Sequence, residues 1–369
     1  MVYRYTNSIV TPTVVCHQGA SATTDNTGTS EERGVPVRKG TNMTIATTRN
    51  DVIVNCLPLN DDERQSFVEA ANGTEQVFVG DPGERNAMSW SIRVPDELRE
   101  RATVIIGNVP ASQMAHYPNL KWLQTWSAGV DAYLAPGILD PSVVVTNASG
   151  AYGQSVSEHL FAMMWALMKN LPQYRDHQQR SEWHDAGAVV SPADATVLVI
   201  GTGDIGSHFA TMCRGVGAHT IGVRRNPNKE ADGIDSMHGF DELDDLLPRA
   251  DVVALIVPST PDTHHLLDGH RLALLKAGAI VLNAGRGDAI DPDALLVNLD
   301  RLRGAGLDVT EPEPLPSDSP LWSHPRCLIT PHVAGGNHLS ATVDRIIAIA
   351  RDNIANYTTG SSLHNMVRR

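Results

Sequence analysis

The stretch Ala195-Thr-Val-Leu-Val-Ile-Gly-Thr-Gly-Asp-Ile-Gly206 joins an apolar run to the pattern G-x-G-x-x-G, and a helical segment, residues 207–216, follows. This order is typical of the turn that binds the pyrophosphate of a dinucleotide. Gly201 allows the tight turn, Gly203 lets the main chain approach the phosphates, and Gly206 lets the helix pack on the strand. The amide groups at the helix start would face the anion. The predicted cofactor contacts at this turn are Gly201, Gly203, Asp204, Ile205 and Gly206.

Short apolar runs alternate with helical segments on both sides of this turn. The candidate strands downstream are residues 195–200, 219–223, 252–257, 279–283, 303–309 and 326–330. Upstream they are residues 52–57, 76–79, 102–106, 120–126 and 143–146. Strict alternation predicts parallel sheets covered by helices on both faces. A long helix is predicted over residues 153–171, before a polar loop at 174–192, and a last one over 339–357.

These elements predict an α/β fold with two Rossmann-like domains. The dinucleotide-binding domain, residues 151–334, would be inserted into a discontinuous, flavodoxin-like substrate domain, residues 43–150 and 335–369. Residues 1–42 are rich in Thr, Ser, Gly and Asn and have little periodicity, so we expect a disordered extension. Met43 is then the expected physiological start.

The composition is that of an ordinary globular protein. The 369 residues are 41% hydrophobic and carry a net charge of -13, which argues against binding to nucleic acid or an anionic membrane. The four cysteines are scattered, without the spacing of a disulfide framework or a metal site. No apolar run is long enough for a membrane span, and the N-terminus lacks a signal-peptide pattern. A cytoplasmic location is therefore expected.

The strand after the glycine turn indicates which dinucleotide is bound. An Asp or Glu at its end would favour NAD(H), but this strand ends in Arg224 and Arg225. Guanidinium groups suit a phosphate monoester, so NADP(H) is preferred and NAD(H) stays possible, through Glu230 or Asp232. A later strand end, residues 258–263, would lie on the same rim. Its predicted contacts are Pro258, Ser259 and Thr263.

Three further strand ends carry groups suited to chemistry. Arg286 lies between two glycines after a buried strand, residues 304–314 run into an acidic, proline-rich loop, and His332 follows a strand end and a proline. Parallel sheets place their ligands at this edge. Taken singly, the acidic loop would more often be plain surface and His332 structural, whereas Arg286 could form a structural ion pair but has open surroundings between its glycines.

Together these segments resemble the D-isomer-specific 2-hydroxyacid dehydrogenase family, over about residues 50 to 360. The resemblance rests on a series of motifs in the family's order: Ser127-Ala-Gly-Val-Asp131, Val156-Ser-Glu-His159, the glycine fingerprint, Asn283-Ala-Gly-Arg-Gly287, Leu307-Asp-Val-Thr-Glu-Pro-Glu-Pro314, Pro320-Leu-Trp322 and Ile329-Thr-Pro-His332. It implies reduction of a small 2-oxo acid to the D-2-hydroxy acid by hydride transfer from NAD(P)H.

The resemblance also implies residue roles. Arg286, Glu313 and His332 would be the catalytic trio: Arg286 would bind the substrate carboxylate and carbonyl oxygen, and His332 would transfer the proton. Glu313 would hydrogen-bond the histidine ring and favour the imidazolium form. The backbone amides of Ala128 and Gly129 would form a second carboxylate cradle. Asp308 would have an orienting role near the nicotinamide end, Ala284 is a further expected cofactor contact, and Trp126, Tyr152 and Trp322 are candidates for the pocket wall.

Several alternatives stay open. The two arginines and the segment 320–325 look most like glyoxylate and hydroxypyruvate reductases, but a branched or aromatic 2-oxo acid reductase is also consistent with the sequence. So is a dinucleotide-sensing, corepressor-like binding protein. The resemblance suggests a homodimer with the helix 153–171 at its interface, although an apolar helix could equally be buried within one chain.

Overall fold

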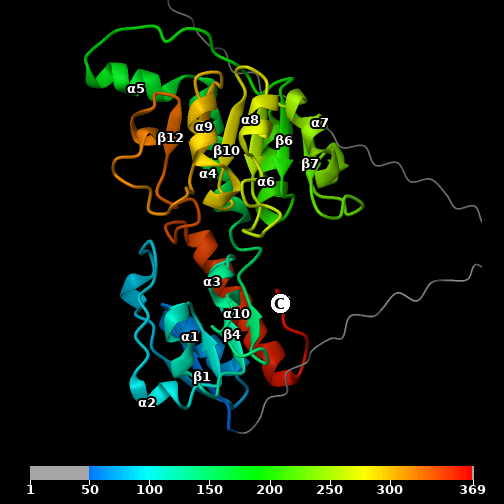
Figure 1. Cartoon of the computed structure of the whole chain (residues 1–369). Helices are drawn as coiled ribbons and strands as arrows, with labels where there is room; N and C mark the ends of the chain where they lie inside the picture. The colour runs from blue at the N-terminus through cyan, green and yellow to red at the C-terminus, as the bar shows by residue number, and fades with distance from the viewer. Residues whose placement is uncertain (1–49, 368–369) are drawn as a thin grey trace, which may run out of the picture. The chain divides into compact units, whose positions relative to one another are not determined.

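The structure, a computed structural model, describes residues 50–367. The predicted disorder of residues 1–42 and the proposed start at Met43 fall outside this range. The described part of the chain contains two parallel sheets, and helices pack against them (Figure 1).

The first sheet has five parallel strands in the order β2-β1-β3-β4-β5, the flavodoxin-like order. The strands are β1 (Val52–Asn55), β2 (Glu75–Phe78), β3 (Val104–Ile106), β4 (Trp122–Gln124) and β5 (Val144–Thr146). Successive side chains of a strand point to opposite faces of the sheet. Ile53 is buried in a cluster with α1 (Asp61–Ala70), whereas Val54 is buried in another with α2 (Asp96–Arg99).

The second sheet has seven parallel strands in the order β12-β11-β10-β9-β6-β7-β8. They are β6 (Thr196–Ile200), β7 (His219–Val223), β8 (Ser236–His238), β9 (Val252–Leu255), β10 (Ile280–Asn283), β11 (Gly304–Leu307) and β12 (Cys327–Ile329). This is the Rossmann arrangement, and its strand order reverses between β6 and β9. A ligand crevice is therefore expected beside the end of β6.

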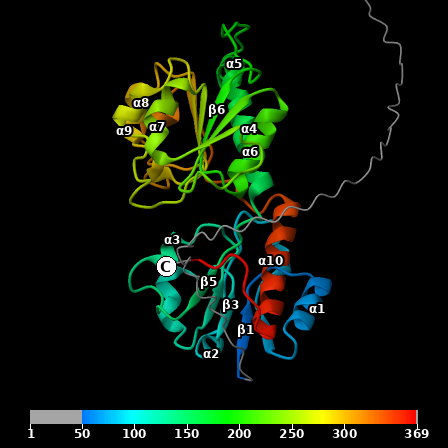
Figure 2. The same cartoon turned by 90° about the vertical axis from the view of Figure 1, so that its right-hand side faces the viewer.

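Helices cover both faces of the seven-stranded sheet, as expected for buried parallel strands (Figure 2). They are α4 (Gly153–Met168) and α6 (Asp204–Gly215) on one face, and α7 (Leu243–Leu246), α8 (Gly269–Leu274) and α9 (Pro292–Asn298) on the other. Val197 and Val199 pack on the first face, and Leu198 and Ile200 on the second. The apolar side of α4 is thus buried within the chain.

The last helix, α10 (Ser340–Thr359), returns to the five-stranded sheet and lies beside α1. Tyr357 is fully buried, and its ring centroid lies 5.2 Å from that of Trp122 on β4. Its hydroxyl donates to Asp51 Oδ2 at 2.9 Å. The domain boundaries proposed from sequence remain a prediction.

Three elements differ from the sequence expectation. The long helix ends at Met168, because Asn170 has a left-handed backbone (φ 55°), and a separate helix α5 (Leu171–Gln179) begins next to Pro172. This helix overlaps the segment expected to be a loop. Strand β8 was not predicted. The short helix α3 (Asp131–Leu134) follows β4 and adjoins the site described next.

Candidate active site

The glycine turn has the geometry that a dinucleotide requires. Gly201 has φ +98°, and a Cβ there would overlap the carbonyl oxygen of Ile256. A Cβ on Gly206 would overlap the carbonyl oxygen of Gly201, so α6 could not pack as closely. Both positions therefore need glycine, one for the turn and one for the packing.

Gly203 differs from these two because no atom lies within 4 Å of the position its Cβ would take. It is the N-cap of α6, whose first residues are Asp204 and Ile205. The amide groups at this helix start carry the positive end of the helix dipole. Open space in front of them fits a pyrophosphate group.

A cavity of about 710 Å³ continues from this turn. Its wall includes Gly201, Gly203, Arg224, Arg225, Asp241, Pro258, Asp262, Thr263 and Arg271. Arg225 is exposed and has no hydrogen bond or ion pair with the residues that the structure describes, whereas Arg224 donates to the carbonyl oxygen of Lys229. Arg271, which sequence reasoning did not single out, is paired with Asp244 at 2.7 Å. Positive charge is thus available at the end of β7.

The two hydroxyl groups predicted on this rim are bonded to the protein itself. Thr263 Oγ1 donates to the carbonyl oxygen of Pro258 at 2.6 Å. Ser259 Oγ donates to Asp288 Oδ2 at 2.5 Å. These bonds shape the loop after β9, and contact of either hydroxyl with a nucleotide stays a prediction.

A second cavity, of about 470 Å³, brings together residues from both sheets. The predicted residues in its wall are Ala128, Gly129, Ile205, Ala284, Arg286, Asp308 and His332. Glu313 does not line the cavity but is hydrogen-bonded to His332, which does. Segments more than 150 residues apart in sequence therefore meet here, and the hydrogen bond between Arg286 and Asp131 joins two of them.

Arg286 follows β10 and reaches the loop after β4. Its Nε donates to Asp131 Oδ2 at 2.8 Å, and Nη1 donates to the carbonyl oxygen of Gly285 at 2.7 Å. Its Nη2 lies so close to Gly129 that a Cβ there would overlap it. Asp131, which no prediction assigned a role, thus holds the guanidinium group by one edge.

Hydrogen bonds fix the loop that faces Arg286. Ser127 Oγ donates to the carbonyl oxygen of Gly129 at 2.6 Å, and Asn147 Nδ2 donates to that of Ala128 at 2.7 Å. The backbone N–H groups of Ala128 and Gly129 have no hydrogen-bond partner within residues 50–367. Two fixed donors are therefore free to bind an anion.

His332 has a backbone conformation that is uncommon for a residue with a side chain, with φ +52°. Its Nδ1 lies 2.6 Å from Glu313 Oε1, and its Nε2 has no hydrogen-bond partner in the described part of the chain. Because a carboxylate only accepts hydrogen bonds, Nδ1 is the donor and Nε2 is the nitrogen left for chemistry. Strained residues held in this way cluster at functional sites.

Asp308, which is 3% exposed, holds the segment that carries His332. Its backbone carbonyl accepts from the His332 N–H at 2.8 Å. Its carboxylate accepts from Thr330 Oγ1 at 2.6 Å and from the N–H groups of Val333 and Ala334 at 3.0 and 3.1 Å. His159 Nε2 lies 2.9 Å from the same threonine hydroxyl. Asp308 thus orients the backbone around the histidine.

The rest of the cavity wall is largely apolar. Tyr152 and Trp126 line it as predicted, and the tyrosine hydroxyl donates to the Trp126 carbonyl oxygen at 2.5 Å. Burial raises the pKa of Tyr152, so this phenol stays neutral. Trp322, in the 3-10 helix η6 (Pro320–Ser323), does not line the cavity, and its indole donates to the carbonyl oxygen of Pro316. Met88 and Asn337 do line the cavity, although the sequence did not indicate them.

One other group of described side chains has the residue types of a metal site. His264, His265 and Glu311 place their ligand atoms within 4.8 Å of one another. The two rings are stacked, with centroids 4.0 Å apart and planes 24° apart, so their lone pairs run nearly parallel and do not converge on one point. His265 Nε2 instead lies 2.8 Å from Glu311 Oε2, which ties the loop after β9 to the loop that carries Glu313.

A Rossmann sheet with a glycine turn, next to a cavity lined by an arginine and a carboxylate-bonded histidine, defines a dinucleotide-dependent oxidoreductase. Comparisons with known proteins agree. The family model described as the NAD-binding domain of D-isomer specific 2-hydroxyacid dehydrogenases matches residues 161–334. Glyoxylate/hydroxypyruvate reductase B of Yersinia pestis (strain Pestoides F) is 30% identical over 258 residues, which cover 68% of this chain and 78% of that protein.

Two crystal structures are similar over 86% of this chain. One is a D-isomer specific 2-hydroxyacid dehydrogenase family protein from Aeromonas salmonicida subsp. salmonicida A449 (TM-score 0.72, 29% identity, 99% of that chain covered). The other, from Xanthobacter autotrophicus Py2, is a D-isomer specific 2-hydroxyacid dehydrogenase in complex with NADPH and MES (TM-score 0.69, 27% identity, 98% covered). The chain belongs to the D-isomer-specific 2-hydroxyacid dehydrogenase family, and it is therefore an NAD(P)-dependent 2-oxo acid reductase.

Proposed function

We propose that this enzyme reduces a small 2-oxo acid of the glyoxylate or hydroxypyruvate type to the D-2-hydroxy acid, with NADPH as the preferred cofactor. The observation that carries this proposal is the arrangement of Arg286 and the His332–Glu313 pair around the 470 Å³ cavity. The name of the Yersinia relative supports the substrate class, and the NADPH bound to the Xanthobacter enzyme supports the cofactor.

Arg286 and the loop opposite would bind the substrate carboxylate. The guanidinium group offers N–H donors in a fork that matches a carboxylate, and the free N–H groups of Ala128 and Gly129 face the same space. Two sets of donors fix the plane of the acid, and with it the position of the neighbouring carbonyl carbon. The -13 charge of the whole chain makes such a local cationic site necessary.

His332 would supply the proton. In reduction Nε2 gives its proton to the carbonyl oxygen, and in oxidation it takes the proton of the hydroxyl group. Glu313 accepts from Nδ1 throughout, which keeps the ring oriented and Nε2 turned to the substrate. The hydrogen bonds of Asp308 keep the backbone of this segment in place.

The residues at the end of β6 and β7 fit the cofactor. The N–H groups at Gly203, Asp204 and Ile205 would hold the pyrophosphate, and Arg224 and Arg225 would hold the 2′-phosphate of NADP(H). When bound, the reduced nicotinamide supplies the hydride. Ile205 and Ala284 line the substrate cavity, so the nicotinamide end would lie against them.

The direct test is NADPH and NADH oxidation at 340 nm with glyoxylate, hydroxypyruvate, pyruvate, phenylpyruvate and branched 2-oxo acids. We expect turnover of a small acid with NADPH, and a loss of about 100-fold or more in kcat for His332→Ala, because proton transfer would be removed. An exposed histidine outside both cavities, His270, provides the control His270→Ala. Near-normal turnover by His332→Ala would contradict the mechanism, and no turnover by the unmodified protein would contradict the function.

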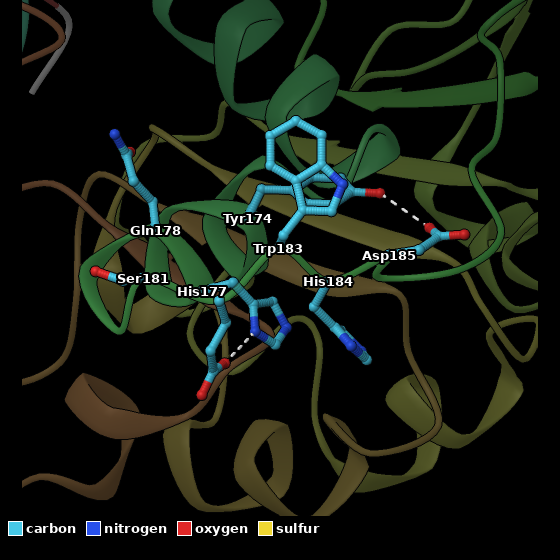
Figure 3. A pocket seen from close by; sticks show the side chains of 8 residues that line it. Tyr174, His177, Gln178, Ser181, Trp183, His184 and Asp185 are labelled. Atoms are coloured by element: carbon cyan, nitrogen blue, oxygen red, sulfur yellow. Dashed lines mark hydrogen bonds and ion pairs between the residues drawn. The ribbon is translucent and has the colours of Figure 1, made fainter.

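We also propose a homodimer that forms through α5 and the segment after it, rather than through α4. Five of the ten exposed large hydrophobic side chains of the described residues lie here, and Trp183 is fully exposed; the five are Leu171, Tyr174, Trp183, Val189 and Val190. Such a gathering of apolar surface is typical of a protein interface. The same segment surrounds a cavity of about 600 Å³ between Tyr174, His177 and Trp183 (Figure 3).

We further propose a cytoplasmic location and no nucleic-acid partner. Cys56, Cys213 and Cys327 are free thiols, as is typical of a reducing compartment. No helix within residues 50–367 combines the length and the apolar character needed to cross a bilayer. The acidic net charge supports the absence of a nucleic-acid partner.

A further inference from the structure

Asn337 lies in the segment that runs from β12 to α10, a few residues after His332. It is 3% exposed and lines the 470 Å³ cavity. Its carboxamide group has no hydrogen-bond partner anywhere in residues 50–367. A polar side chain that is almost completely buried therefore faces the substrate cavity unpaired.

A carboxamide without a partner in the protein has to be satisfied by solvent or by a ligand, because leaving it without either costs free energy. Most buried polar side chains in folded proteins are hydrogen-bonded. The cavity is the space from which a partner can reach Asn337. Neither polar atom of Asn337 is among the fully buried, unpartnered side-chain atoms of the described residues, so the carboxamide is open to the cavity and a ligand there can bind it.

The surroundings of Asn337 are apolar or already bonded. The sulfur of Met88 lies against Gly336, so that a Cβ on this glycine would come within 2.7 Å of it. The ring of Tyr152 lies beside Gly335, and its hydroxyl is already bonded to Trp126. On this side of the cavity, Asn337 is the side chain that can still donate and accept hydrogen bonds.

The proposed binding of the carboxylate at Arg286 and of the carbonyl oxygen at His332 leaves one part of the substrate unassigned. This is the group on the other side of the carbonyl carbon, at C3. A carboxamide offers both N–H donors and a carbonyl acceptor, and a hydroxyl group can satisfy either of them. A methyl group would leave the amide unpaired.

We propose that Asn337 hydrogen-bonds a hydroxyl group on C3 and so makes the enzyme selective for 3-hydroxy-2-oxo acids over 2-oxo acids with an alkyl group there. This assignment rests on the proposed function and narrows it. Sites built to bond a hydroxyl reject the analogue without it far more strongly than apolar pockets reject an extra methylene. Hydroxypyruvate and pyruvate differ only in this hydroxyl group and are the matched pair of probes.

The experiment compares kcat/KM for hydroxypyruvate, pyruvate and glyoxylate in the unmodified enzyme and in Asn337→Leu. The unmodified enzyme should prefer hydroxypyruvate to pyruvate by about 100-fold or more. Asn337→Leu should lower kcat/KM for hydroxypyruvate about 30-fold and change that for pyruvate and glyoxylate less than about 3-fold. Asn337→Ala, which keeps the loop free of a larger side chain, should show the same selectivity change.

Two controls separate recognition from structure. Met88→Leu changes an apolar neighbour in the same wall and should change hydroxypyruvate and pyruvate reduction in the same proportion. Thermal unfolding of Asn337→Leu without substrate should occur within about 3 °C of the temperature of the unmodified enzyme, because the substitution removes no hydrogen bond within the protein.

The outcomes are distinguishable. Equal losses for all three acids, together with lower thermal stability, would make Asn337 structural and overturn the assignment. Turnover without preference for hydroxypyruvate would overturn the assignment and leave the proposed function standing. No turnover with any 2-oxo acid would overturn both.

Discussion

The contact with Asp131 orients Arg286, the residue that we propose binds the substrate carboxylate. Asp131 binds Nε at 2.8 Å and the carbonyl oxygen of Gly285 binds Nη1. These two contacts fix the plane of the guanidinium group and leave Nη2 beside Gly129. Both charged side chains are partly exposed, at 29% and 44%, so the pair itself adds little stability. We interpret Asp131 as a positioning residue.

Loss of this contact should weaken substrate binding. We expect Asp131→Ala to lower kcat/KM about 10-fold, mainly through KM, because the guanidinium group is no longer held in one orientation. Asp131→Asn should retain most of the activity, since its amide oxygen can accept the same hydrogen bond. Steady-state kinetics with the best acid of the panel measures both. A higher kcat/KM in Asp131→Ala would instead mean that Asp131 competes with the substrate carboxylate.

The sequence predicted some site residues and missed others for a physical reason. Arg286 and His332 were proposed from the sequence because glycine and proline place them at the ends of strands, where parallel sheets bind ligands. Asp131, Met88 and Asn337 lie in loops or at a short helix, and their contacts join segments distant in sequence. Only the folded chain brings these segments together.

Some helices and strands were likewise predicted from the sequence, and others were missed. The central strands and the helix after the glycine turn were predicted because their apolar periodicity is strong. Helix α5 reads Leu-Pro-Gln-Tyr-Arg-Asp-His-Gln-Gln and has no large apolar side chain after Tyr174, so the helical periodicity is missing and the segment was expected to be a loop. Strand β8 is three residues long, lies at the sheet edge, and reads Ser-Met-His rather than as an apolar run.

The end of β7 provides a test of cofactor choice. We expect the double substitution Arg224→Ala, Arg225→Ala to lower kcat/KM for NADPH about 10- to 100-fold and to change that for NADH little, because charge-assisted bonds to the 2′-phosphate are lost. Arg249, an exposed arginine outside the wall of this cavity, gives the control Arg249→Ala. An equal loss with both cofactors would contradict the proposed role of these arginines.

For the assembled protein, the prediction concerns the exposed apolar side chains of α5 and of the segment after it, which includes Trp183. Trp183→Asp should convert a dimer to a monomer, because a charge would have to be buried in an apolar interface. Size-exclusion chromatography with light scattering measures the mass of each variant. Trp322, which is 48% exposed and lies in η6 outside this segment, gives the control Trp322→Asp. A monomeric unmodified protein, or a dimeric Trp183→Asp variant, would contradict the proposed interface.

The return of α10 to the five-stranded sheet has a consequence for the order in which the protein can be completed on the ribosome. Tyr357 binds Asp51, which is 306 residues earlier in the chain. At about 5–20 residues per second, synthesis takes roughly 15–60 s to cover that distance. All strands of the seven-stranded sheet are made before α10 emerges. The five-stranded sheet is translated first, but its core is completed last. The apolar face that α10 covers therefore stays exposed during most of translation.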